Sequence, residues 1–68
     1  MATYCVNKNQ QNNGDHEVHK EGCNYYPEPQ NRIVLGSFFN CREAVQEARK
    51  HYFQVNGCYF CSLPCHTS

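Results

Sequence analysis

Apolar residues recur along this chain with two different periods, and each period predicts a different kind of element. Residues 3–6 (Thr-Tyr-Cys-Val) form a short β-prone segment, and a second strand is expected over residues 15–20. Between them lies a polar stretch that contains Asn-Asn-Gly at 12–14, which is typical of a turn. The two segments therefore predict a hairpin with a long loop. Residues 32–36 contain three successive aliphatic residues ended by glycine, and they predict a third strand.

The longest periodic segment predicts a helix over residues 40–55. Asn40 suits the N-cap, and Glu43 follows three residues later as its capping-box partner. Apolar side chains then recur at helical spacing and fall on one face. They are Cys41, Ala44, Val45, Ala48, Tyr52 and Val55. Asn56 and Gly57 come next and are suited to the left-handed conformation that ends a helix.

The order of these elements is three strands, one helix and then a cysteine-rich end. It predicts a single α+β domain over residues 1–68, in which a small antiparallel sheet of about three strands packs on the helix. A chain of this length buries only about 60% of its unfolded surface. Small domains usually need disulfides, a metal ion or a partner as a further constraint. The six cysteines of this chain can provide one.

The compartment bears on which constraint the cysteines provide. The N-terminus has no basic start followed by an apolar run, and no apolar stretch approaches the ~20 residues of a membrane span. The default expectation is a cytoplasmic protein without a membrane segment, in which thiols stay reduced and metal binding is favoured over disulfides. A mature secreted domain would have the same sequence after its signal is removed. A disulfide-stapled exported domain is therefore an alternative hypothesis.

The C-terminal segment carries the strongest chemical signal. Cys58 and Cys61 are separated by two residues, a spacing that lets two sulfurs face one point, as tetrahedral zinc requires. We predict a structural zinc site in a C-terminal knuckle. Its expected ligands are Cys58, Cys61, Cys65 and, from a loop in the N-terminal half, Cys23. The alternative ligands are His66, His19 and Cys5. His16 and His19 should point to opposite faces of their strand, so they are not expected to share an ion.

Cys41 has a separate interpretation. A helix over 40–55 is roughly 22 Å long, which places Cys41 at the opposite end from Cys58. Cys41 could then meet Cys65 or His66 only if the tail ran back along the helix as a strand, and such a strand would pull the knuckle apart. A reactive thiol at the start of the helix is the enzymatic alternative, a redox enzyme or sensor using Cys41. Against it, Cys41 continues the apolar face of the helix.

Charge and aromatic content bear on the partner. Six basic and six acidic residues cancel, which argues against a nucleic-acid-binding module, although aromatic residues beside basic ones can stack on bases. We expect Tyr25, Tyr26 and Tyr59 to be exposed contacts for a protein partner. A closed zinc site leaves no open position for catalysis, so the expected role is a non-enzymatic zinc-binding adaptor.

Several short strings carry a resemblance that spans nearly the whole chain. They are Tyr4-Cys-Val-Asn, residues 13–19, Leu35-Gly-x-Phe, Cys41 and Gly57-Cys-x-x-Cys. Together they resemble a family of short uncharacterised cysteine-containing bacterial proteins, and the resemblance implies no activity. Residues 35–40, leading into an Ala-rich helix, are similar to the strand–helix junction of peptidoglycan-binding SPOR domains over about twenty residues. The abundant cysteines and the lack of an export signal depart from that family, so glycan binding is not implied.

Overall fold

The computed structural model describes residues 1–67 and confirms the predicted α+β fold. Its strands are β1 (Ala2–Asn7), β2 (His16–Lys20), β3 (Arg32–Phe38) and β4 (Val55–Gly57), and its helix is α1 (Cys41–Ala48). Two short 3-10 turns cover Pro29–Asn31 and Leu63–Cys65. None of the described helices is long and apolar enough to cross a membrane.

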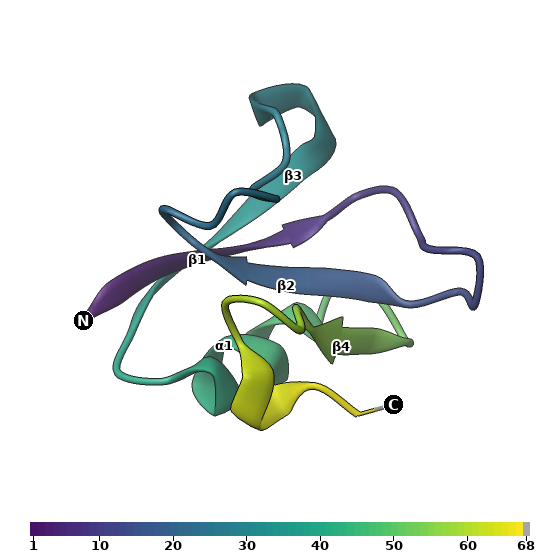
Figure 1. The fold of residues 1–68 in the computed structure, drawn as a ribbon. Helices are drawn as coiled ribbons and strands as arrows, with labels where there is room; N and C mark the ends of the chain where they lie inside the picture. Colours follow the sequence, from purple (N-terminus) through teal and green to yellow (C-terminus); the bar gives the residue numbers. More distant parts are fainter. Residues whose placement is uncertain (68) are drawn as a thin grey trace.

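The four strands form one sheet in the order β3-β1-β2-β4 (Figure 1). β1 pairs antiparallel with β2, as the predicted hairpin requires, and its other edge pairs antiparallel with β3. β4 pairs parallel with β2, so the sheet is mixed and has one strand more than expected. Figure 1 shows α1 and the C-terminal segment on the same side of the molecule as β4.

The loop between β1 and β2 has the turn chemistry that its sequence predicted. The N–H of Asp15 donates to Asn13 Oδ1 at 2.9 Å, and Gly14 adopts a positive φ of 93°. The side chain of Gln54 reaches the loop and donates to the Asn13 carbonyl at 2.9 Å and to Asp15 Oδ1 at 2.6 Å. These bonds tie the hairpin loop to the segment just before β4.

β3 does not end at Gly36 but continues to Phe38 through a bulge. Tyr4 pairs with Gly36 and Cys5 pairs with Val34, which leaves Leu35 as the extra residue. Gly36 has a φ of 123°, a conformation that favours glycine. The bulge shifts the alternation of the strand, so Phe38 joins Leu35 in packing against the core.

α1 starts where the sequence predicted and ends earlier. Asn40 Oδ1 accepts a hydrogen bond from the N–H of Glu43 at 3.1 Å, and the Glu43 carboxylate accepts one from the N–H of Phe39 at 3.1 Å. The predicted end at residue 55 is wrong, because the helix stops at Ala48 and Val55 begins β4. Residues 51–53 are His-Tyr-Phe, which favour a helix less than the Ala- and Glu-rich turns before them.

The sequence predicted that Gly57 ends the helix, but this residue lies within β4. Its role is close packing. A Cβ at this position would come within 2.8 Å of both Cys65 Cβ and the Ser62 carbonyl oxygen. The absent side chain therefore lets the C-terminal turn pack directly on β4.

Candidate metal centre

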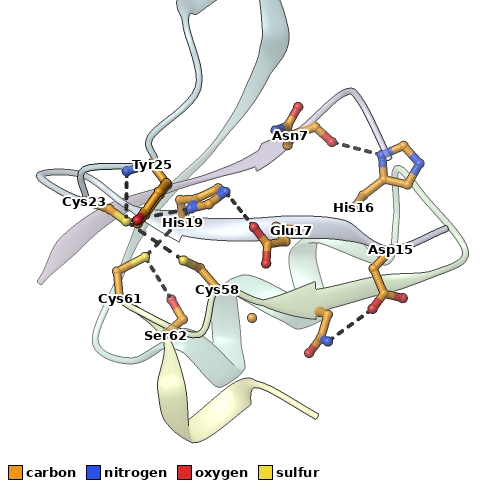
Figure 2. A network of polar contacts seen from close by, with 12 residues as sticks. Asn7, Asp15, His16, Glu17, His19, Cys23, Tyr25, Cys58, Cys61 and Ser62 are labelled. Carbon is orange, nitrogen blue, oxygen red and sulfur yellow. Dashed lines mark hydrogen bonds and ion pairs between the residues drawn. The ribbon is translucent and has the colours of Figure 1, made fainter. Parts of the chain in front are cut away.

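Four potential metal ligands converge at one end of β2: His19, Cys23, Cys58 and Cys61 (Figure 2). Their ligand atoms all lie within 4.8 Å of one another. Cys23 Sγ is 3.9 Å from His19 Nδ1 and 3.9 Å from Cys58 Sγ. Cys61 Sγ also lies 3.9 Å from His19 Nδ1. The nitrogen and the three sulfurs therefore surround a common point.

The parallel pairing of β2 with β4 explains why these residues meet. Val18 pairs with Gly57, so the residues that follow them, His19 in β2 and Cys58 just after β4, come to the same end of the sheet. The N–H of Cys58 donates to the Val18 carbonyl at 3.0 Å and fixes this approach. A turn follows each strand and brings in the other two ligands. In the first turn the N–H of Cys23 donates to Lys20 O at 3.1 Å.

The second turn is the knuckle that the C-x2-C spacing predicted. The N–H of Ser62 donates to the Cys58 carbonyl at 2.8 Å, which folds the chain between them back on itself. Cys58 and Cys61 both contribute to the cluster as a result. The His19–Cys23 spacing of three intervening residues supplies the second local pair of ligands.

The spacing of the four atoms fits a tetrahedral ion. Zinc bonds of about 2.3 Å to sulfur and about 2.0–2.1 Å to nitrogen place neighbouring ligand atoms roughly 3.6–3.8 Å apart. Three of the six separations are 3.9 Å, close to this value, and the other three are at most 4.8 Å, so a bound ion would draw the ligand atoms slightly closer together. Three thiols and one imidazole also match the donor types that structural zinc takes.

Hydrogen bonds orient the candidate ligands from outside the cluster. The backbone N–H of Lys20 donates to Cys61 Sγ at 3.3 Å, and that of Tyr25 donates to Cys23 Sγ at 3.4 Å. His19 turns Nδ1 toward the sulfurs and places Nε2 3.4 Å from Glu17 Oε1 (Figure 2). An Nε2–H facing the carboxylate leaves Nδ1 free to bind a cation, an arrangement common among metal-bound histidines.

Burial makes the cluster unfavourable for charge unless a cation is present. His19 and Cys58 are each only 1% exposed. Burial lowers the pKa of the His19 imidazole and raises the pKa of the Cys58 and Cys61 thiols above their ordinary values. A neutral imidazole is the form that binds metal, and a divalent cation would favour the thiolates that burial alone disfavours.

Cys65 is not part of this cluster, which corrects one of the predicted ligands. Cys65 forms a disulfide with Cys41. The argument that a Cys41–Cys65 contact excludes a knuckle is also wrong. With its end at Ala48, α1 is only about 12 Å long, and the tail returns through a 3-10 turn after Cys61. Cys41 is 7% exposed and bonded to Cys65, so its thiol is not free in this structure.

Two alternative ligands lie elsewhere. His66 Nδ1 is 3.0 Å from the carbonyl oxygen of Gly57. Cys5 is fully buried on the sheet, and burial raises the pKa of its thiol to about 11. His16 does not join His19 in the cluster, as expected, and stacks on the Tyr52 ring at a centroid distance of 3.7 Å.

The predicted contact tyrosines fall in two environments. Tyr25 and Tyr59 are 56% and 54% exposed. Tyr26 is half-buried, lies under the Arg32 guanidinium at 4.8 Å, and has its pKa raised to about 12, chiefly by burial. Phe60, which the sequence did not single out, is 69% exposed and contacts both exposed tyrosines. Its position between the knuckle cysteines was the available signal.

Comparisons with protein-family models, with curated proteins and with solved structures gave no match to this chain. The assignment of the site therefore depends on its chemistry and geometry.

Proposed function

We propose that this chain is a small zinc-binding module, in which His19, Cys23, Cys58 and Cys61 hold one structural ion. The observation that supports this most directly is the approach of the four ligand atoms to within 4.8 Å of one another. Three cysteine sulfurs and one imidazole nitrogen around one point are a donor set typical of structural zinc sites. Sulfur and nitrogen donors at tetrahedral spacing favour zinc over magnesium or calcium, which take oxygen ligands.

The role of the ion is structural. Four protein ligands complete a tetrahedral shell and leave no coordination position for a substrate. The ion joins residues 19–23 to residues 58–61, two segments that are far apart in the sequence. It also closes the end of the sheet where β2 and β4 run parallel over only three residue pairs.

The module serves as an adaptor that contacts another protein. Tyr25, Tyr59 and Phe60 are exposed beside the cluster, and a small rigid domain can present such rings at little entropic cost. No group in the cluster combines an activated nucleophile with a base and an open position, so a binding role fits the site better than catalysis.

Native mass spectrometry of purified protein tests the metal site. We expect one zinc per chain, lost on treatment with chelator, and X-ray absorption should show three sulfur neighbours and one nitrogen neighbour. Cys58→Ser should lose the zinc. Cys5→Ser is the matched control, because Cys5 is equally buried on the sheet but lies outside the cluster. A folded wild-type protein without metal would overturn the proposal.

A thiol count separates the zinc site from a disulfide-stapled exported domain, which the Cys41–Cys65 bond favours as the second candidate. Cys5, Cys23, Cys58 and Cys61 are free, so a denatured and chelated sample should react at four thiols. Cys23 Sγ and Cys58 Sγ are close enough for oxidation to join them. A count of two with Cys23 bonded to Cys58 and no zinc would favour the stapled domain.

A further inference from the structure

A groove of about 360 Å³ lies directly beside the candidate metal centre. Tyr25, Tyr59 and Phe60 line it together with Glu17, and His19 and Cys58 of the cluster also border it. The groove therefore combines aromatic rings, a carboxylate and two of the proposed zinc ligands.

The three rings support one another and remain accessible. The Tyr25 and Phe60 centroids are 4.8 Å apart, and Tyr59 meets Phe60 edge-on at 5.3 Å. Each ring nevertheless has more than half of its residue surface exposed. Exposed ring faces carry negative charge density and attract cations.

The other groups at the groove also carry negative charge. Glu17 is the one charged residue among the described residues that line it, and no lysine or arginine borders it. Zinc bound by three thiolates and a neutral imidazole adds a formal charge of about −1. Both charges lie next to rings that already favour a cation.

We infer that this groove receives a lysine or arginine side chain of a protein partner. The inference rests on the proposed zinc site, which supplies part of the negative charge, and it specifies the chemistry of the proposed partner. The aliphatic stem of such a side chain can pack on the rings while its charged head faces Glu17. The phosphates of a nucleic acid would meet repulsion at the same place.

An NMR titration of the zinc-loaded, ¹⁵N-labelled protein tests the inference. The probes are two blocked peptides, Gly-Ser-Lys-Ser-Gly and the same sequence with norleucine in place of lysine, which has a similar stem but no charge. We expect saturable shifts at Tyr25, Tyr59 and Phe60 with the lysine peptide, and weaker binding at higher salt. The norleucine peptide should bind roughly two- to fivefold more weakly, which is the difference in affinity that a cation–π contact gives at an exposed site.

Two variants and a control locate the effect. Tyr59→Ala and Glu17→Gln should each weaken lysine binding by roughly two- to fivefold. Glu17→Gln keeps an oxygen that can accept from His19, and native mass spectrometry checks that each variant still holds one zinc. Phe39→Ala removes a ring that is 80% exposed but does not line the groove, and should leave binding unchanged.

The outcomes distinguish this inference from the proposed function. Zinc-loaded protein that binds both peptides equally, or that binds a short oligothymidine at the groove instead, would overturn the inference alone. Folded protein without zinc would overturn the proposed function and, with it, the charge argument made here.

Discussion

The two faces of the sheet are held in different ways. On one face Tyr4, Val6 and Val18 pack against the buried side of α1. On the other face, because side chains alternate along a strand, lie Cys5 and His19, which pair across β1 and β2. The first face is stabilised by apolar burial, whereas the second presents sulfur and imidazole.

The difference shows how little apolar material the chain has for a second core. The largest side chain with under 2% exposure is His19, followed by Val6 and Val18. No leucine, isoleucine or phenylalanine among the described residues is fully buried. A cluster that binds an ion can hold the second face where hydrophobic burial is too small, and a structural metal is one of the usual stabilising devices in domains of this size.

The largest expected effect comes from removing the ion from the second face. Zinc binding to small domains contributes on the order of 10 kcal/mol, which is comparable to the whole stability of a small protein. We expect chelated protein to lose its folded circular dichroism spectrum and to regain it with zinc. Val18→Ala on the apolar face should instead cost about 2 kcal/mol and keep one zinc. If chelated and zinc-loaded protein unfold at the same denaturant concentration, the ion does not stabilise the second face and the proposed difference between the two faces is wrong.

Removing the disulfide should have the next largest effect on stability, and this effect should fall on the apolar face. Cys41 starts α1 and is bonded to Cys65, 24 positions later in the sequence. Loop entropy predicts a stabilisation of about 3.5 kcal/mol for this separation. The double variant Cys41→Ala/Cys65→Ala should lower the free energy of unfolding by this amount in urea titrations. Zinc stoichiometry should be unchanged. Loss of zinc in this variant would show that the disulfide positions the knuckle, and the two faces would then be coupled.

Alkaline pH should destabilise the second face through Cys5. Its folded pKa of about 11 lies above the ordinary thiol pKa of 9.0, because burial disfavours the thiolate. The unfolded chain therefore releases this proton first as pH rises. Stability is fully present below pH 9 and falls between about pH 9 and 11, by at most about 1.4 kcal/mol per pH unit. Burial of Tyr26 acts in the same direction at higher pH.

Urea unfolding at pH 8 and pH 10 measures this effect. Cys5→Ala lacks the titrating group and serves as the control, so the stability gap between wild type and variant should narrow at pH 10. A constant gap would show that Cys5 ionises with an ordinary pKa in the folded protein.

The elements that local sequence determines were predictable. The Asn-Gly turn before β2, the aliphatic run of β3 and the Asn40 cap each depend on residues within a few positions. The helix end was mispredicted because Tyr52 and Val55 keep the helical period while taking part in a different packing. β4 contains three residues and owes its existence to pairing with β2, so periodicity could not reveal it.

The candidate site was predictable in part for the same reason. The C-x2-C step is a local signal, and the structure brings Cys58 and Cys61 together with Cys23. His19 joins them because β4 runs parallel to β2, which is a nonlocal fact. The local spacing did not distinguish Cys65 from Cys58 and Cys61. Cys65 bonds to Cys41 because the C-terminal turn packs closely on Gly57, which is a tertiary contact.

The smallest expected effect comes from removing the N-cap of α1, and it tests whether the two faces are stabilised independently. Asn40 Oδ1 accepts from the N–H of Glu43, and Asn40→Ala leaves that donor without its partner. The expected loss is about 1 kcal/mol of unfolding free energy. Asn40→Asp is the matched control, since its carboxylate can accept the same bond and also favours the helix N-terminus. Because the cap supports only the helix that covers the apolar face, zinc content and the shifts of His19 should match wild type in both variants. A change in zinc affinity with Asn40→Ala alone would mean that α1 and the metal cluster fold as one cooperative unit, and that the ion depends on apolar packing.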